Sequence, residues 1–363
     1  MNIANLLEKL CLAPAPSGYE KESAMIFKRE IEPYVDSIEI DRIGNVIATQ
    51  KGKKDNGHSI MVFAHLDQLG FIVRRIEPNG FIQVDRLGGI PEKILPALRI
   101  CIRTVDGRFI PGVIANKSHH TVSADEKYRV DPVTSLFIDI GASTEGEAHD
   151  MGVEIGCPAI YEPSFKAIGN NNMVSGTSID NRGGCTALIY AASLLKEKGS
   201  PVTVHFVGTV WEEFNIRGAV IAARKLKADI AFCVDIILAG DTPDLCNHYN
   251  NKLGCGPTIN LYSFHGRGTL NGTIPNERLV KLAVSAAAED GISLQKFASL
   301  GMITDSAYVQ MENNGVACLD MGFPCRYTHS PIEVCNINDI EMLGKLIAAV
   351  VYRIDSNFDV CRY

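Results

Sequence analysis

The sequence predicts an α/β protein in which a mixed sheet, flanked by helices, is interrupted by an inserted small β-barrel-like domain. Helical and apolar strand patterns alternate before residue 70 and again after residue 166. Short alternating runs separated by Gly and Pro fill the stretch between them. With 363 residues, of which 46% are hydrophobic and 21% charged, the chain is long enough for two domains with ordinary globular cores.

The first segment predicts two helices followed by three strands. The helices are expected over residues 2–11 and 20–33, and the strands over 37–40, 46–49 and 58–64. The next stretch is typical of a small antiparallel β domain or barrel, with one short helix near 144–151 that Ser143 or Thr144 is placed to cap. We therefore expect one domain made of residues 1–70 and 166–363 and an inserted β-rich domain made of residues 71–165.

After residue 166 the pattern predicts helices and strands in alternation. Helices are expected over 182–198, 216–226, 276–290 and 304–313, and strands over 202–210, 229–235, 256–262, 294–298 and 316–320. The last helix, expected over 338–354, has its apolar residues on one stripe, and Asn338 is placed to cap it.

Composition excludes several classes of protein. The net charge of -7 argues against a basic surface for nucleic acid. The 11 cysteines form no CxxC pair and indicate reduced core residues in a reducing compartment. The N-terminal pattern differs from that of a signal peptide, and no stretch approaches the roughly 20 apolar residues that a membrane helix needs. We expect a cytoplasmic protein that contacts neither nucleic acid nor membrane.

Imidazole and carboxylate side chains follow apolar runs at several points of the chain. They are His65 and Asp67 in MVFAHLD, Asp180 in GTSIDNR, Glu212 and Glu213 in VHFVGTVWEE, Asp235 in IAFCVD, and His329 in RYTHSP. Apolar runs of this kind indicate buried strands, and strands of one α/β sheet bring such residues to one edge, where ligands tend to bind. Two imidazoles and several carboxylates suit a site for two divalent metals, which points to metal-assisted hydrolysis.

Each of these residues also has an ordinary explanation when it is taken alone. His65 and Asp67 could be a core histidine with a local partner, and Asp180 could be a helix cap unless Asn181 takes that role. The adjacent Glu212 and Glu213 are the least ordinary pair, because two carboxylates at the end of an apolar strand are costly without metal, water or charge partners. The combination, more than any single residue, predicts a metal site.

The segments that carry these residues resemble the tetrahedral aminopeptidases, the di-metal peptidases that include glutamyl and deblocking aminopeptidases. The matching segments, in the order the family has them, are AHLDQLGFIV, SIDNRGGC, WEEFNIRGA, VDIILAGDTP and PCRYTHSPIEV. The resemblance implies a zinc-exopeptidase-like catalytic domain that acts on peptides. It also implies that the β-rich insertion helps to assemble a homo-oligomer, built from dimers into a hollow tetrahedral dodecamer.

The resemblance also implies a role for each residue of the site. His65 and Asp235 would bind one divalent ion and Glu213 and His329 a second, with Asp180 bridging the two. Glu212 would act as general base on a water held between the metals, and Asp67 would support the centre from behind. The ions are zinc or cobalt in the family, and manganese is a further candidate. The implied reaction removes the N-terminal residue of a peptide.

Several positions depart from the family pattern and leave the substrate preference open. They are Gln68, Thr177-Ser178, Asn181, Phe214-Asn215 and the region 246–273. Two other functions therefore stay open: a di-metal amidohydrolase or deacylase acting on small N-acyl compounds, and a non-catalytic assembly scaffold.

Three of the histidines outside this pattern invite comparison with a binding site. His119 and His120 lack carboxylates at ligand spacing, which favours a structural or subunit-contact role over a second metal site. His265 and Arg267 could bind an acidic side chain, although such residues in a Gly-rich loop are usually solvated.

Overall fold

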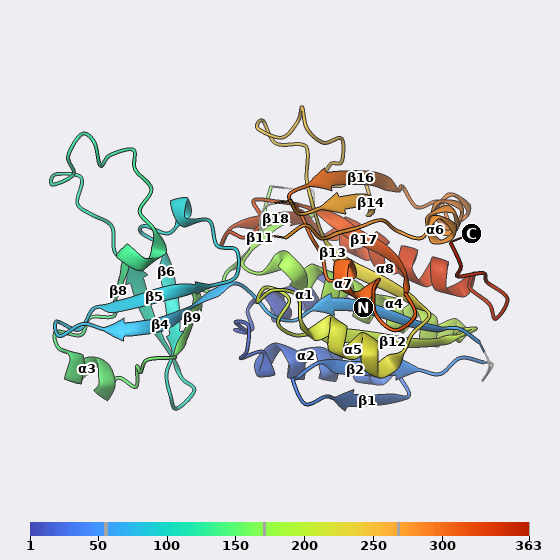
Figure 1. Ribbon diagram of the computed structural model, residues 1–363, viewed down its shortest axis with the longest axis horizontal. Helices are drawn as coiled ribbons and strands as arrows, with labels where there is room; N and C mark the ends of the chain where they lie inside the picture. Colours follow the sequence, from blue (N-terminus) through green and yellow to red (C-terminus); the bar gives the residue numbers. More distant parts are fainter. Residues whose placement is uncertain (54–56, 170–171, 267–268, 363) are drawn as a thin grey trace.

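The computed structural model describes residues 1–53, 57–169, 172–266 and 269–362, so Arg267 lies outside the described residues. A large mixed sheet with helices on both faces makes up one part of the molecule, and a closed barrel of strands lies beside it (Figure 1). This arrangement confirms the predicted α/β fold with an inserted barrel. The exact domain boundaries at residues 71 and 165 stay a prediction.

The large sheet is built from strands of both halves of the chain. Its strands are β1 (Ser37–Ile40), β2 (Val46–Gln50), β3 (Ser59–His65), β10 (Phe165–Ile168), β11 (Met173–Gly176), β12 (Thr203–Thr209), β13 (Ile230–Leu238), β14 (Thr258–Phe264), β15 (Gly272–Thr273), β16 (Gln295–Leu300), β17 (Ala317–Arg326) and β18 (Glu333–Asn336). The main path runs β1-β2-β12-β3-β13-β17-β18-β11-β10, and β14 joins β15 and β16 to β17. The central strands β12, β3, β13 and β17 are parallel, so their carboxyl ends meet at one edge.

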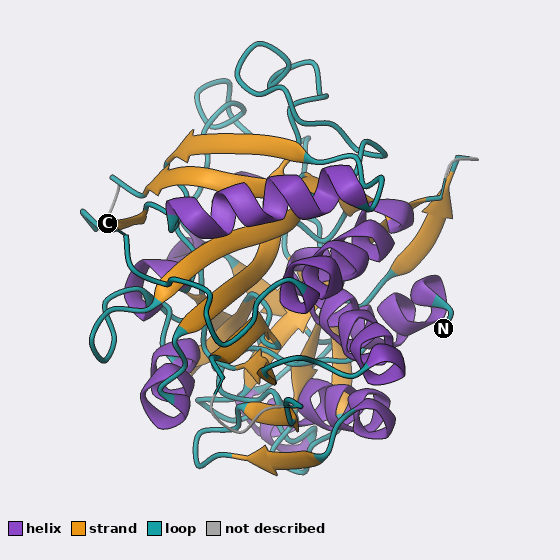
Figure 2. Cartoon of the chain, turned by 90° about the vertical axis from the view of Figure 1, so that its right-hand side faces the viewer, coloured by secondary structure: helices purple, strands orange, loops and turns teal. Residues whose placement is uncertain are grey.

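Helices cover both faces of this sheet (Figure 2). They are α1 (Ile3–Cys11), α2 (Lys21–Ile31), α4 (Ile179–Lys198), α5 (Gly218–Leu226), α6 (Glu277–Glu289), α7 (Ser306–Val309) and α8 (Ile337–Tyr352). Successive side chains of β3 point to opposite faces. Ile60, Val62 and Ala64 pack in the core under α1, α2, α4, α6 and α8. Met61 and Phe63 pack in the core under α5 and α7.

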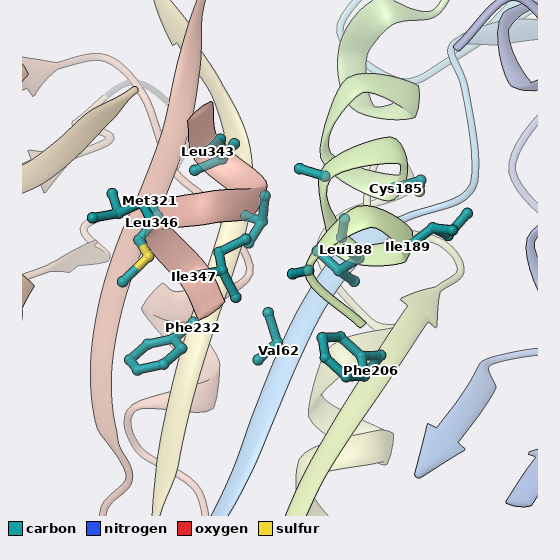
Figure 3. Close-up of a cluster of buried hydrophobic side chains, with 14 of the residues drawn as sticks. Val62, Cys185, Leu188, Ile189, Phe206, Phe232, Met321, Leu343, Leu346 and Ile347 are labelled. Atoms are coloured by element: carbon teal, nitrogen blue, oxygen red, sulfur yellow. The ribbon is translucent and has the colours of Figure 1, made fainter. Parts of the chain in front are cut away.

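The larger core lies between the sheet and the pair α4 and α8. Figure 3 shows Val62, Phe206 and Phe232 of the sheet facing Leu188 of α4 and Ile347 of α8. All five are fully buried, and burial of each such side chain stabilises the fold by roughly 1.5–3 kcal/mol. The two helices approach closely at a glycine of α8, since a Cβ at Gly344 would lie 3.1 Å from the Ala187 carbonyl oxygen.

The barrel has a core of its own. Its strands are β4 (Gly70–Ile76), β5 (Ile82–Leu87), β6 (Arg99–Arg103), β7 (Phe109–Ile114), β8 (Phe137–Asp139) and β9 (Pro158–Tyr161). They close in the order β4-β5-β8-β7-β6-β9, and full closure removes exposed sheet edges. Phe71, Val73, Ile102 and Ile138 are among the buried residues inside. The short helix α3 (Glu145–Asp150) begins where it was predicted, with the Thr144 side chain accepting the Glu147 N–H.

Some elements differ from the sequence-based expectations. Strand β13 continues to Leu238, so Asp235 lies inside a strand and not at its end, and β17 likewise runs on to Arg326. The helix expected over 304–313 is only the four-residue α7. Asn336, and not Asn338, caps α8, because β18 passes directly into that helix and places the Asn336 side chain at the Asn338 N–H.

Three short 3₁₀ helices, at Glu32–Tyr34, Glu92–Ile94 and Val133–Ser135, complete the described secondary structure. None of the helices in the described ranges has the length and apolar character that crossing a bilayer requires.

Candidate metal centre

Three adjacent parallel strands bring four of the predicted residues to one edge of the sheet. His65 is the last residue of β3, and Thr209 of β12 is its direct neighbour, so Glu212 and Glu213 follow just past the same edge. On the other side, β13 pairs with β3 from Ile230↔Ile60 to Cys233↔Phe63. The same register, continued by two residues, sets Asp235 level with His65. Register thus accounts for this part of the site.

Asp180 reaches the same place from the start of α4. The Asn181 side chain accepts the Gly184 N–H at 3.1 Å and donates to the Val234 carbonyl oxygen at 2.7 Å. Asn181 therefore caps the helix, as one of the two alternatives predicted, and the Asp180 carboxylate stays available for another partner. The Asp180–Asn181 peptide bond is cis.

His329 arrives from the loop between β17 and β18 and completes a second set of ligand atoms. On one side of Asp180, Oδ1 lies 3.1 Å from His65 Nε2, which in turn lies 3.9 Å from Asp235 Oδ1. On the other side, Oδ2 lies 3.6 Å from His329 Nε2, which lies 4.0 Å from Glu213 Oε1. One carboxylate thus faces two sets of ligand atoms, each oxygen toward a different imidazole.

Backbone carbonyl groups orient both imidazoles. The Nδ1 atom of His65 lies 3.2 Å from the Asp67 carbonyl oxygen, and that of His329 lies 2.7 Å from the Gly89 carbonyl oxygen in the barrel. A carbonyl oxygen only accepts, so Nδ1–H must donate, and Nε2 is left unprotonated in each neutral ring. Metal-binding histidines commonly have this arrangement.

Asp67 holds the backbone of the paired glutamates. Its carboxylate is fully buried and accepts the backbone N–H groups of Glu212 and Glu213, each at 3.0 Å. It also accepts the Ser17 hydroxyl at 2.6 Å. The Asp67 carboxylate does not hydrogen bond the His65 ring, since its Oδ1 lies 3.6 Å from Nδ1. Asp67 instead fixes the turn that carries Glu212 and Glu213.

Burial and like charge shift the pKa values of the site. Burial raises the pKa of Glu213 to about 7 against the opposing charge of His329. Burial also raises the pKa values of Glu212 and Asp235 well above their usual values. Burial lowers the pKa of His329, but Glu213 and Asp180 outweigh it and bring the value to about 9. The metal-free site therefore retains protons that bound cations would displace.

His65 and Asp180 shift as a pair. Burial lowers the pKa of His65, yet the hydrogen bond to Asp180 and the other carboxylates raise it well above its usual value. Burial raises the pKa of Asp180, but the same hydrogen bond and the charges of His65 and His329 lower it overall.

The donor set fits divalent cations. Among the described residues, three groups have ligand atoms that all lie within 4.8 Å of one another: His65–Asp180–Asp235, Asp180–Glu213–His329 and His65–Glu212–Glu213. Imidazole nitrogen and carboxylate oxygen are usual ligands of zinc and of related metals. The first two groups share Asp180 and match the predicted pair of sites. The third shows that Glu212 also lies within ligand reach.

Two buried carboxylates near the site were missed from the sequence. Glu333 is 2% exposed and accepts the backbone N–H groups of Asp180 and His329. Asp305 is 2% exposed, lies 3.4 Å from the Thr209 hydroxyl, and has its pKa raised by burial to about 7. The only sequence signal for Glu333 is a lone carboxylate in an apolar run four residues after His329.

Arg182 is a buried cation next to Gln68. Arg182 is 0% exposed, and its Nη2 atom donates to the Ala13 carbonyl oxygen at 3.4 Å and to Gln68 Oε1 at 3.5 Å. Within the described ranges, its Nε and Nη1 atoms have no hydrogen-bond partner. Gln68, one of the departures from the family pattern, therefore faces a guanidinium that forms no ion pair with any carboxylate in the described part of the chain.

A cavity of about 360 Å³ opens beside the ligands. Its lining includes five of the predicted site residues, namely His65, Asp180, Glu212, Asp235 and His329. The other lining residues are Pro91, Ile236, Leu238, His265, Gly301, Met302, Ile303, Thr304 and Thr328. A larger hollow of about 520 Å³ lies on the barrel and includes His119, but none of the predicted ligands lines it. The smaller cavity is therefore the one that suits a substrate.

Comparison with known proteins agrees with this geometry. Residues 44–346 match the model of the M42 glutamyl aminopeptidase family. The Escherichia coli protein SgcX is 37% identical over 95% of this chain and 92% of its own. The aminopeptidase APDkam598 of Desulfurococcus kamchatkensis has a TM-score of 0.91 and 31% identity, with 98% and 95% of the two chains covered. The Pyrococcus horikoshii TET1 peptidase, which can assemble into a tetrahedron or a large octahedral shell, has a TM-score of 0.84 and 29% identity, with 97% and 100% covered.

Proposed function

Given that this chain belongs to the M42 glutamyl aminopeptidase family and is a metalloaminopeptidase, we propose that it cleaves N-terminal residues from peptides at the site around Asp180. The observation that carries the proposal is the pair of three-residue ligand groups that share this one carboxylate. His65 and Asp235 would complete one ion's ligands, and Glu213 and His329 the other's. Zinc, cobalt and manganese all suit these nitrogen and oxygen donors.

Two bound divalent ions would lower the pKa of a water molecule and polarise the scissile carbonyl group. The protein must then supply a proton acceptor. Glu212 suits this role because it lines the cavity, its side chain is 12% exposed, and its Oε2 atom lies 4.0 Å from His65 Nε2. Burial raises its pKa, which favours taking a proton from water and later giving it to the leaving amine.

The charge of the site favours substrates with a free amino group. The carboxylates in and beside the site outnumber the four positive charges of two divalent cations; they are Asp67, Asp180, Glu212, Glu213, Asp235, Asp305 and Glu333. The positive charge of an N-terminal ammonium offsets part of this excess. An N-acylated compound lacks this charge, so the aminopeptidase proposal is favoured over the deacylase alternative.

The cavity favours an uncharged N-terminal side chain. Apart from the proposed site residues and His265, its described lining offers apolar or neutral groups, among them Ile236, Leu238, Met302 and Ile303. Burying a charged side chain against such a wall without a partner is unfavourable. We therefore expect leucine to be preferred to glutamate or lysine at the N-terminus.

The barrel is proposed to assemble subunits into a homo-oligomer, as the resemblance to the tetrahedral aminopeptidases implies. Large apolar side chains stay exposed on its surface, including Val105, Tyr128 and Ile155, which are 67%, 85% and 68% exposed. Association of copies would cover such residues. Sedimentation analysis of the full chain measures the assembly directly, and a monomer at micromolar concentration would contradict it.

A panel of substrates tests the proposed reaction. The protein is stripped with chelator, then reloaded separately with zinc, cobalt or manganese, and assayed on leucyl, glutamyl and lysyl anilides and on N-acetyl-leucine. We expect cleavage of leucyl anilide that chelator abolishes and metal restores. Faster turnover of N-acetyl-leucine would support the deacylase instead. Failure to cleave any amide with any metal would support the scaffold, and activity that ignores chelator would refute the metal site.

A further inference from the structure

We propose that Glu333 is a positioning residue that sets the second ligand group, Asp180–Glu213–His329, an inference that rests on the metal site proposed above. Glu333 lies outside that group, but its two carboxylate oxygens hold the backbone of two of the three members. Oε2 accepts the Asp180 N–H at 3.0 Å, and Oε1 accepts the His329 N–H at 2.9 Å. One buried side chain thus links two ligands that are 149 residues apart in the sequence.

Glu333 is itself firmly placed. It is the first residue of β18, and it pairs with Gly176 of β11 while the same strand pairs with β17 on its other side. Its two ligand partners are less constrained, since Asp180 lies where a strand passes into α4 and His329 lies in a loop. His329 also has a positive φ of 65°, a conformation that non-glycine residues seldom adopt. A carboxylate anchored in the sheet compensates for this local freedom.

The arrangement repeats what Asp67 does on the other side of the site. Asp67 accepts the backbone N–H groups of Glu212 and Glu213, and Glu333 accepts those of Asp180 and His329. Every member of the second ligand group therefore has its backbone N–H bonded to one of two buried carboxylates. In the first group, His65 and Asp235 lie in strands β3 and β13, so the pairing of the sheet holds their backbone. Glu333 holds two members of the second group and only the shared Asp180 of the first, so its loss should weaken the second group more than the first.

The chain offers a matched control in Asp339. This residue is 1% exposed, and its carboxylate accepts the backbone N–H groups of Gly254 and Gly256 at 2.7 and 2.8 Å. It has the same type and number of bonds as Glu333, but neither partner is a proposed ligand. Glu333→Gln and Asp339→Asn remove the same charge and disturb the same kind of contact. They differ in that only the backbone held by Glu333 belongs to proposed metal ligands.

The experiment measures bound zinc in the full-length protein across a series of buffered zinc concentrations, together with thermal unfolding of the metal-free forms. We expect two sites in the unsubstituted protein. Glu333→Gln should weaken zinc binding at the second ligand group about 10–100-fold and at the first group less, as is usual when a residue that orients metal ligands is lost. His329→Ala should resemble it, because this variant lacks one ligand of the second group outright. Asp339→Asn should keep both affinities while losing a comparable amount of thermal stability.

Two results would overturn the inference. One is a Glu333→Gln protein with two unchanged zinc affinities, and the other is equal loss of zinc in Glu333→Gln and Asp339→Asn. If Glu333→Gln does not fold, Glu333→Asp keeps the charge but shortens the reach, and it should show a smaller loss at the same site; unchanged zinc binding in that variant also overturns the inference. Failure of the unsubstituted protein to bind zinc would instead refute the proposed metal site, and the role of Glu333 with it.

Discussion

Replacing Asp67 with Asn is the most direct test of how the paired glutamates are held. The substitution keeps the size of a fully buried side chain but removes its charge and turns one acceptor oxygen into an NH₂ donor. In the present structure the carboxylate accepts three hydrogen bonds, from the N–H groups of Glu212 and Glu213 and from the Ser17 hydroxyl. An amide accepts through one oxygen only.

The expected loss of stability follows from those three hydrogen bonds. If the amide oxygen faces Glu213 and Ser17, the new NH₂ group points at the Glu212 N–H, and a buried donor without an acceptor costs about 1–3 kcal/mol. The two bonds that remain become neutral ones, each weaker by about 1 kcal/mol. The free energy of unfolding should therefore fall by about 3–5 kcal/mol. A shift of the Glu212 carboxylate should also lower kcat about 10–100-fold.

Urea unfolding of metal-free protein measures the loss of stability. Leucyl anilide turnover by zinc-loaded protein measures the loss of kcat. Ser17→Ala is the control, because it removes only the bond from the hydroxyl and leaves both backbone bonds of the carboxylate. Its cost should be about 1.5–3 kcal/mol, with a smaller change in kcat. A D67N protein with unchanged unfolding free energy and unchanged kcat would refute this account of the site. So would an S17A protein as impaired in kcat as D67N.

The remaining predictions concern proton transfer, the buried cation and pH. Glu212→Gln should lower kcat at least about 100-fold while zinc content stays unchanged, as elemental assay and kinetics will show; normal turnover would defeat the general-base role. Gln68→Glu should raise the free energy of unfolding by about 1–2 kcal/mol, because it gives the guanidinium of Arg182 a carboxylate partner, and a lower urea midpoint would contradict this. Burial raises the pKa of Glu213 from 4.5 to about 7; for His329, burial acts to lower it, but neighbouring carboxylates raise it from 6.5 to about 9. Both groups bind protons more tightly when folded, so metal-free protein should lose stability as pH rises between about 5 and 9, and a rising urea midpoint in that window would refute the assignment.

Local patterns in the sequence were enough for most of the fold. The apolar runs that end at His65 and before Glu212 predicted buried strands, and those strands lie side by side in the sheet. The spacing of turns over 71–165 predicted a small β domain, which is the closed barrel. These predictions succeed because hydrophobic periodicity and the positions of Gly and Pro are local properties of the sequence. They failed on lengths, as with β13 and α7, because pairing partners decide where an element ends.

The sequence by itself determined which side chains could bind metal, since their chemical types and their places after apolar runs are visible in it. Only the tertiary structure decided how these side chains divide between the two ligand groups. Strand register sets Asp235 level with His65, the cap made by Asn181 leaves Asp180 free to face both imidazoles, and the barrel supplies the carbonyl of Gly89 that orients His329. The role of the Glu333 carboxylate could not be assigned from the sequence for the same reason. Its role comes from backbone groups far away in the chain, and long-range contacts of that kind leave no local pattern.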